Sequence, residues 1–235
     1  MSTFALIHGA GDVGWYWHLV EAELRARGHG ALAPDLPADD DDPLGLDDYA
    51  DAMVEAVGDR RNLVVVGQSF GAFTAPLVAD RLQADVLVLV AGMIPFPGEP
   101  PGDWWENTGY SDAVREQATR DGGLTGNQDP YVSFYHDVPR CLAEEAMSKE
   151  RSHPSEASQS APWPLDAWPD VQTKFVLCTE DRFLPPDFLR RQVAERLHIT
   201  PDEILAGHCV ALSRPKELAH LLIGYAHAGR TTTRP

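Results

Sequence analysis

Short apolar runs that alternate with amphipathic segments constrain the fold of this chain more than any other feature. Several of these runs are apolar at every position rather than at every second one, as in Leu63–Val66. This pattern is typical of strands that are buried on both faces, as in a parallel sheet covered by helices. The runs are Phe4–Ile7, Ala31–Ala33, Leu63–Val66, Val86–Ala91, Phe175–Cys178 and Ile204–Ala206. Their alternation with helical segments predicts right-handed crossovers and a doubly wound α/β sheet.

The segments between the runs carry apolar residues every three or four positions, which places these residues on one helical face. In one segment Trp17, Val20 and Leu24 form such a face, and Gly28 is placed to end the helix. The chain has 235 residues, of which 43% are hydrophobic, so one sizeable core is possible. We therefore expect a single domain over residues 1–235.

From about Pro95 to Asp170 this rhythm breaks, and the sequence becomes rich in Pro, Gly, Trp and polar residues. Only Ser111–Thr119 and Pro139–Glu150 have a helical pattern. A structureless loop of this length is improbable inside a compact domain. We expect a mostly helical cap, approximately residues 95–170, inserted after the fourth strand.

The charge and the cysteines limit the partners and the compartment. The formal net charge is -17, which disfavours binding to nucleic acid or to an anionic membrane, because phosphate would be repelled. Asp39–Asp42 is expected to be an acidic surface loop, and Thr231–Pro235 a frayed tail. The cysteines Cys141, Cys178 and Cys209 are far apart, the N-terminus shows no basic leader, and no apolar run approaches the ~20 residues of a membrane span. These features predict a cytoplasmic protein with reduced thiols.

A nucleophile motif follows the third apolar run. Gly67-Gln68-Ser69-Phe70-Gly71 matches G-x-S-x-G and lies between a predicted strand and a predicted helix, which is the context this motif requires. Such a turn holds the serine hydroxyl at a helix N-terminus, where developing negative charge is favoured. The alternative is a plain glycine-rich turn with a capping serine. We predict that Ser69 is the nucleophile and that the backbone N–H of Phe70 donates to the oxyanion.

The general base must be chosen from nine histidines by position. His208 follows the last apolar run and precedes the last helix, so its side chain can reach over the carboxyl edge of the sheet toward Ser69. The other histidines lie before the serine, in the presumed cap or in helices. We predict that His208 is the base. Cys209, which follows it, is expected to pack rather than to react.

These motifs resemble the α/β-hydrolase superfamily over nearly the whole chain. They are most similar to the small esterases and hydroxynitrile lyases whose first strand ends in a His-Gly-Ala type motif, here His8-Gly9-Ala10. The resemblance implies that the Ala10 N–H is the other oxyanion donor, with Gly11 as the next candidate, and that His8 is a buried orienting residue. The residue before the nucleophile is often histidine in that superfamily, whereas here it is Gln68.

The resemblance also bears on the catalytic acid and the sheet. Asp181 follows the fifth apolar run and precedes a proline, as the acid of the family does, and it would hold the imidazole in the required tautomer. Glu180 is the adjacent alternative. Family members often begin with an antiparallel hairpin, for which this chain has no room. We therefore expect a minimal six-stranded, all-parallel sheet in the order 2-1-3-4-5-6.

The substrate is predicted only as a class. Aromatic residues of the cap are candidates for binding it, although each could simply pack the cap against the body. The candidates are Trp104, Trp105, Tyr110, Phe134 and Tyr135. An apolar, aromatic pocket suits a small to medium neutral carboxylic ester or lactone. The expected mechanism proceeds through an acyl-enzyme and needs no metal and no organic cofactor.

Two other functions are compatible with the same residues. One is a cofactor-free lyase reaction such as cyanohydrin cleavage, in which His208 abstracts a proton and no acyl-enzyme forms. The resemblance associates a cap lysine with cyanide in those lyases, and the cap lysine here is Lys149. The other is a non-catalytic binder of small molecules. A serine that fails to react with a fluorophosphonate would favour the binder.

Overall fold

The computed structural model describes residues 1–37 and 44–232. Within these residues six strands form one sheet in the order β2-β1-β3-β4-β5-β6, and every neighbouring pair is parallel. The strands are β1 Thr3–Ile7, β2 Gly30–Leu32, β3 Leu63–Gln68, β4 Val86–Val90, β5 Gln172–Cys178 and β6 Asp202–Ile204. The predicted all-parallel sheet and its strand order are thus confirmed. The run Asp39–Asp42 and the last three residues of the predicted tail lie outside the described residues.

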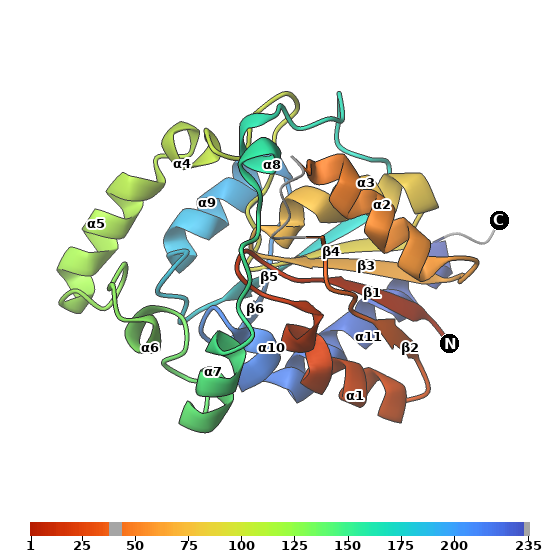
Figure 1. Cartoon of the computed structure of the whole chain (residues 1–235), viewed down its shortest axis with the longest axis horizontal. Coiled ribbons are helices and arrows are strands. Elements are labelled where there is room, and N and C mark those ends of the chain that lie inside the picture. Colours follow the sequence, from red (N-terminus) through yellow and green to blue (C-terminus); the bar gives the residue numbers. More distant parts are fainter. Residues whose placement is uncertain (38–43, 233–235) are drawn as a thin grey trace.

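Helices cover both faces of the sheet (Figure 1). One face packs against α2 Leu46–Val57, α3 Gly71–Leu82 and α9 Pro186–Arg196. The other face packs against the 3-10 helix η1 Gly14–Trp17 and the helices α1 His18–Ala26, α10 Val210–Ser213 and α11 Pro215–Thr232. Both layers bury apolar residues of every central strand, which explains why the runs have no polar alternation.

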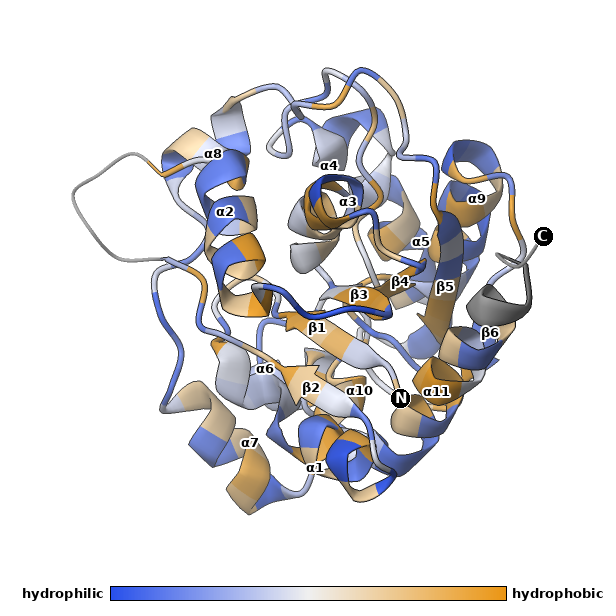
Figure 2. Cartoon of the chain, turned by 90° about the vertical axis from the view of Figure 1, so that its right-hand side faces the viewer, coloured by the Kyte–Doolittle hydropathy of each residue, from blue (hydrophilic) through white to orange (hydrophobic). Residues whose placement is uncertain are grey.

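Strand β1 illustrates this two-sided burial. Ala5 and Ile7 pack in the core on the side of α2 and α3. Phe4 and Leu6 pack in the core on the side of α1 and α11. All four residues are fully buried. Figure 2 shows the hydrophobic central strands β1, β3 and β4 between helices that carry both hydrophobic and hydrophilic residues. The two cores together fix the sheet, and with it the position of the strand ends that carry the candidate site.

The segment between β4 and β5, all of which the structure describes, contains five helices, but fewer than half of its residues are helical, so it is less helical than expected. It contains α4 Trp104–Asn107, α5 Tyr110–Asp121, α6 Pro130–Ser133, α7 Arg140–Met147 and α8 Glu156–Ser160. Figure 1 shows α4, α5 and α6 beyond the carboxyl ends of the strands. We call residues 95–170 the inserted segment. The sequence indicated only α5 and α7, because α4, α6 and α8 have four or five residues each and are too short to show a helical period.

The last strand differs from its prediction. The apolar run Ile204–Ala206 indicated a strand, but β6 spans Asp202–Ile204 and Leu205 is 66% exposed. As an edge strand, β6 pairs only with β5, over three residues. The chain then leaves the sheet toward Gly207, which brings the following histidine over the sheet edge.

Truncation of a central strand is expected to destabilise the protein strongly. Leu89 in β4 is fully buried between β3 and β5, so Leu89→Ala leaves a cavity and should lower the free energy of unfolding by about 3 kcal/mol. Leu205→Ala is the matched control, because this leucine is mostly exposed, and it should cost less than about 0.5 kcal/mol. Urea unfolding monitored by circular dichroism measures both. Equal losses for the two variants would contradict the described burial.

Candidate active site

The nucleophile motif forms a tight turn between β3, which ends at Gln68, and α3, which begins at Gly71. Ser69 lies between them with a φ of 50°, in the left-handed region that side chains seldom adopt. Two backbone hydrogen bonds hold this conformation. The Ser69 N–H donates to the carbonyl of Val90 at 3.2 Å, and the Ser69 carbonyl accepts from the N–H of Met93 at 3.0 Å. Strand β4 and its following loop therefore stabilise a strained serine.

The two glycines of the motif are required by close packing. A Cβ atom on Gly67 would lie 2.6 Å from the Cβ of Ala75, and one on Gly71 would lie 2.5 Å from the carbonyl oxygen of His8. The first neighbour belongs to helix α3 and the second to the loop after β1, and neither can move away without opening the packing of α3 against the sheet. The turn therefore draws helix α3 close to β1 and places Ser69 beside the loop that follows β1.

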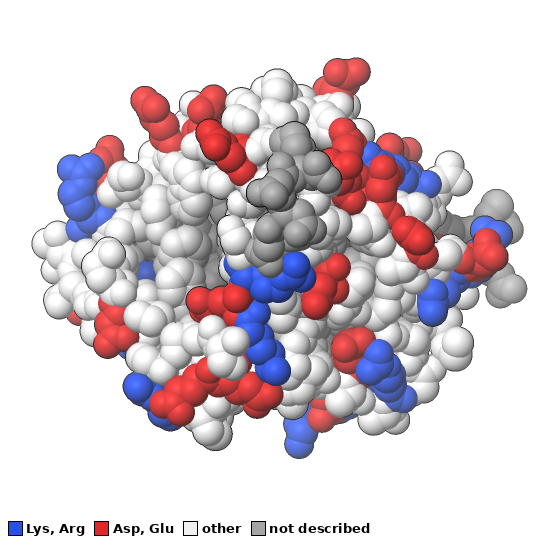
Figure 3. Space-filling view, in the orientation of Figure 1, with Lys and Arg blue, Asp and Glu red and all other residues white. Residues whose placement is uncertain are grey.

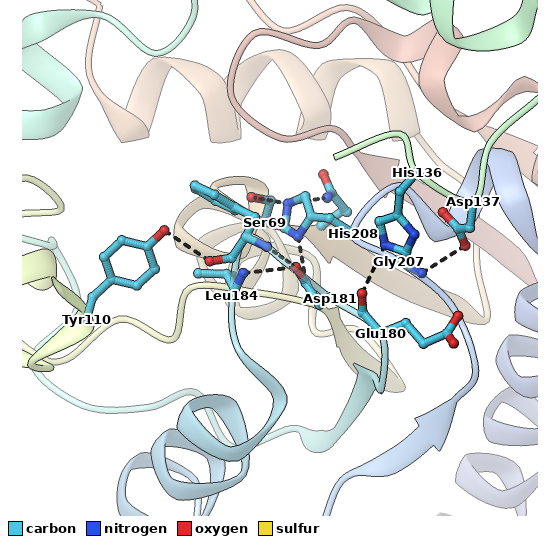
Figure 4. A network of polar contacts seen from close by, with 11 residues as sticks. Ser69, Tyr110, His136, Asp137, Glu180, Asp181, Leu184, Gly207 and His208 are labelled. Atoms are coloured by element: carbon cyan, nitrogen blue, oxygen red, sulfur yellow. Dashed lines mark hydrogen bonds and ion pairs between the residues drawn. The ribbon is translucent and has the colours of Figure 1, made fainter. Parts of the chain in front are cut away.

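Three predicted residues meet in one chain of hydrogen bonds (Figure 4). The Oγ of Ser69 lies 3.1 Å from Nε2 of His208, and Nδ1 of His208 lies 2.7 Å from Oδ2 of Asp181. All three side chains are buried. A proton on Nδ1 that is donated to the carboxylate leaves Nε2 with a free lone pair, so Nε2 can accept the serine proton.

The carboxylate of Asp181 is held by the turn that follows β5. Its Oδ1 accepts hydrogen bonds from the backbone N–H groups of Phe183 and Leu184 at 2.8 and 2.9 Å. Its Oδ2 remains for His208. The neighbouring Glu180 is exposed and makes no hydrogen bond to His208. Of the two adjacent acids, Asp181 therefore contacts the imidazole and Glu180 does not.

Gln68 contacts the same imidazole. Its Nε2 lies 3.2 Å from Nε2 of His208, so the amide competes with Ser69 for one lone pair. The amide can donate to this nitrogen only while the nitrogen carries no proton. The sequence showed only that the position departs from the histidine that the superfamily often has.

The loop after β1 offers backbone donors beside the serine. Ala10 lines the cavity in front of Ser69, and its N–H donates to no acceptor within the described residues. The same holds for the N–H of Phe70, which precedes helix α3. The N–H of Gly11, the other candidate, already donates to the carbonyl of His153 at 2.7 Å. The two predicted donors are therefore available, and the runner-up is not.

His8 orients this loop from below. It is buried, its Nε2 accepts from the N–H of Leu36 at 3.0 Å, and its Nδ1 lies 2.9 Å from the carbonyl of Gly9. Both contacts are satisfied by a neutral ring with the proton on Nδ1. Burial lowers the pKa of His8 from 6.5 to about 4, against the opposing effects of the Gly9 carbonyl and the charge of Asp35.

The His8 ring predicts a loss of stability in mild acid. Because the folded-state pKa is below the unfolded one, the stabilisation is fully present above pH 6.5 and is lost as the pH falls toward 4. The loss should reach about 3 kcal/mol. Urea unfolding at several pH values should show a smaller acid loss for His8→Gln than for the wild type. Parallel curves for the two proteins would contradict a neutral buried His8.

The inserted segment is tied to both loops that carry the acid and the base (Figure 4). Oδ2 of Asp137 accepts from the backbone N–H of Gly207 at 2.8 Å, one residue before the base. Nε2 of His136 lies 3.0 Å from the carbonyl of Glu180, one residue before the acid. A Cβ on Gly207 would lie 2.7 Å from Oδ1 of Asp137, so this contact requires glycine. No sequence motif marks the Asp137 contact.

Loss of the Asp137 contact is expected to impair turnover rather than binding. Asp137→Ala removes the acceptor that fixes Gly207, so the neighbouring base should lose alignment and kcat should fall about tenfold with little change in KM. Asp137→Asn keeps an oxygen acceptor and should remain within about threefold of the wild type. Steady-state kinetics on an aryl ester distinguishes the two. Equal losses in both variants, or a loss confined to KM, would exclude this positioning role.

A cavity of about 440 Å³ opens in front of Ser69. Of the predicted substrate-binding residues, Phe134 and Tyr135 line it. Phe183, which the sequence did not single out, also lines it and stacks edge-on against His208 with ring centroids 5.0 Å apart. Asp12, Met147 and Glu150 complete a lining that is less neutral than expected.

The other three predicted aromatic residues form a separate cluster. Trp104 is fully buried, and its indole N–H donates to the carbonyl of Ile94 at 3.0 Å. Trp105 and Tyr110 pack with ring centroids 4.8 Å apart, and the Tyr110 hydroxyl donates to the carbonyl of Phe183 at 3.0 Å. The structure therefore places these three residues behind the cavity wall rather than in the lining.

Other predicted features are located as follows. Lys149 pairs with Glu145 at 3.5 Å, lies over the ring of Trp15, and is not among the cavity-lining residues. Cys178 and Cys209 are buried free thiols, and burial raises the pKa of both. The described ranges contain no group of three or more His, Cys, Asp or Glu arranged to bind a metal ion. In the same ranges no helix has the length and apolarity needed to cross a membrane.

Comparisons with known proteins agree with this geometry. A family model described as "Alpha/beta hydrolase family" matches residues 4–221. Methylesterase 7 of Arabidopsis thaliana is 27% identical over 256 residues, with 95% of each chain covered. An alpha-hydroxynitrile lyase of the same plant is 25% identical over 240 residues, covering 92% of this chain and 93% of the lyase.

The solved structures show the same fold. A pyrethroid hydrolase from Sphingobium faniae superimposes with a TM-score of 0.74 at 19% identity, covering 98% of this chain and 99% of that one. Polyneuridine aldehyde esterase gives a TM-score of 0.73 at 20% identity, with coverage of 95% and 98%. Since the family model, the sheet order and the turn at Ser69 all agree, and the relatives that it resembles are small esterases and hydroxynitrile lyases, the chain belongs to the α/β-hydrolase family.

Proposed function

We propose that this protein is a serine hydrolase that cleaves small to medium carboxylic esters or lactones through an acyl-enzyme. The observation that carries the proposal is the hydrogen-bonded chain from Ser69 through His208 to Asp181 at the floor of the cavity. The relatives include a methylesterase and rice esterases, which supports a hydrolase. A cytoplasmic location, a single domain over residues 1–235 and a cap formed by the inserted segment are part of the same proposal.

In the acylation half-reaction, the Oγ of Ser69 attacks the ester carbonyl while Nε2 of His208 accepts its proton. Asp181 stabilises the resulting imidazolium through Nδ1. The free N–H groups of Ala10 and Phe70 donate to the oxyanion of the tetrahedral intermediate. The intermediate collapses when His208 returns the proton to the leaving alcohol, which leaves the acyl group on Ser69.

In the deacylation half-reaction, a water molecule takes the place of the alcohol. His208 accepts a proton from this water, whose oxygen attacks the acyl carbonyl, and then returns the proton to Oγ of Ser69. The product acid leaves and the starting state is restored. Phe134, Tyr135 and Phe183 form the apolar part of the cavity and bind the substrate beside the serine.

A lyase reaction is the second candidate, because the hydroxynitrile lyases are among the relatives. In that reaction His208 would abstract the hydroxyl proton of a cyanohydrin, and no acyl-enzyme would form. A cation near the serine would assist the departing cyanide, but Lys149 is engaged outside the cavity. Ester hydrolysis is therefore the better-supported proposal.

A panel of p-nitrophenyl esters tests this proposal. The wild type is expected to release nitrophenol from short-chain esters with saturation kinetics, and to hydrolyse lactones of similar size. Mandelonitrile in the same buffer tests cyanohydrin cleavage. Release at the rate of buffer alone for every ester, together with cleavage of mandelonitrile, would reverse the order of the two candidates.

A further inference from the structure

A carboxyl group in the cavity has no role in the proposed hydrolysis. Asp12 lies two residues after Ala10, the proposed oxyanion donor, and lines the same cavity as Ser69 and His208. Its side chain accepts no hydrogen bond from any residue that the structure describes, and no ion pair includes it. The exposed fraction of Asp12 is intermediate, because the residue lines the cavity. An unpaired carboxyl is therefore presented to whatever fills the cavity.

The surroundings supply no permanent counter-charge, because His208 is positively charged only when it is protonated. Glu150, which is exposed, lines the same cavity and adds a second carboxyl. No Lys or Arg is among the described lining residues. The Tyr16 and Tyr135 hydroxyls and the Cys209 thiol also lie near Asp12, and none of them is a cation.

The titration of Asp12 reflects this isolation. Burial raises the pKa of Asp12 to about 7, the charge of His208 lowers it, and the charge of Glu150 raises it. A buried carboxylate without a partner is unfavourable, and a cation placed beside it removes much of that cost. A carboxylate ligand would have the opposite effect, because like charges disfavour each other at short range.

The net charge of the protein and the aromatic lining of the cavity also favour a cationic ligand. The formal net charge is -17, and Figure 3 shows acidic side chains spread over the imaged face. Such a field raises the local concentration of cations and repels anions. The rings of Phe134, Tyr135 and Phe183, which line the cavity, can also contact an ammonium group through their faces.

We propose that Asp12 makes the cavity selective for esters that carry a cationic amine, with the ammonium group seated between Asp12 and the aromatic wall. Esters with a free carboxylate are excluded by the same group. This proposal names the substrate class of the proposed hydrolase and therefore rests on that function. Asp12 is a specificity-determining residue in it and takes no part in the proton transfers.

The kinetic test compares two isosteric esters, acetylcholine and its neutral carbon isostere, in which a tert-butyl group replaces the trimethylammonium group. The measured quantity is the ratio of their kcat/KM values, since differences in intrinsic reactivity cancel when the ratio is compared between proteins. Asp12→Asn should lower this ratio by about tenfold or more relative to the wild type. Asp112→Asn, which removes the same charge from an exposed site on α5, should leave the ratio unchanged.

A ratio that is the same in the wild type and in Asp12→Asn would overturn the proposal. The ratio would also stay the same if Asp12 acted only through His208, because both esters would then lose activity together.

A binding experiment separates a failure of this proposal from a failure of the hydrolase proposal. Calorimetry on Ser69→Ala with choline and its neutral carbon isostere should show tighter choline binding, which is lost in Ser69→Ala/Asp12→Asn. Equal affinities would refute the cation site even if esters are hydrolysed. A choline preference without any ester hydrolysis would uphold the site and refute the hydrolase.

Discussion

Ser69→Ala is expected to lower kcat for ester hydrolysis by about 10⁵- to 10⁶-fold. The variant removes the only oxygen that lies within hydrogen-bond distance of Nε2 of His208 among the described side chains. What remains is the stabilisation by the backbone donors and by substrate binding, which gives only a small rate above that in water. KM should change much less than kcat. The comparison requires single-turnover and steady-state kinetics on one aryl ester.

Ser111→Ala provides the matched control, because this serine is exposed on α5 and makes no contact with the base. It should hydrolyse the ester like the wild type. Circular dichroism should show that both variants are folded. If Ser69→Ala retained more than about a hundredth of the wild-type kcat, Ser69 would not be the nucleophile.

Asp181→Asn is expected to lower kcat by about 10³- to 10⁴-fold. The asparagine oxygen can still accept from the N–H groups of Phe183 and Leu184, so the turn should keep its shape. Its amide N–H₂ would then face Nδ1 of His208 and force the ring proton onto Nε2. A protonated Nε2 cannot accept the serine proton.

Glu180→Gln is the control for Asp181→Asn, since it changes the adjacent acid that the sequence left as an alternative. Glu180 is exposed, and its hydrogen bonds within the described residues use backbone atoms: its carbonyl lies 3.0 Å from Nε2 of His136, and its N–H donates to the carbonyl of Ala206 at 3.0 Å. Its side-chain variant should stay within about twofold of the wild type. The reverse pattern, with the larger loss in Glu180→Gln, would assign the acid to Glu180.

The central sheet could be predicted because its strands are buried on both faces. The runs that became β1, β3 and β4 contain almost no polar residue, so their position follows from hydrophobicity alone. The edge strand β6 was misplaced by two residues, because its first two residues, Asp202 and Glu203, are charged and exposed. Hydrophobicity cannot mark a strand that is defined mainly by pairing.

The candidate site likewise contains residues that the sequence identified and residues that it did not. Ser69, Asp181 and His208 were identifiable because each follows a predicted strand, and the carboxyl ends of parallel strands meet at one edge. Asp12 and Asp137 were not singled out, since their roles depend on how the inserted segment lies over that edge. The aromatic residues of that segment were sorted into lining and packing only by the structure, as Trp104 shows.

The most direct test of the account is to trap the acyl-enzyme. The protein is mixed with a slowly deacylating ester such as p-nitrophenyl pivalate, quenched in acid, and examined by intact and peptide mass spectrometry. We expect one pivaloyl group per chain, located on the peptide that contains Ser69, and no adduct in Ser69→Ala. Ester turnover with no adduct, or an adduct on another residue that persists in Ser69→Ala, would contradict this expectation.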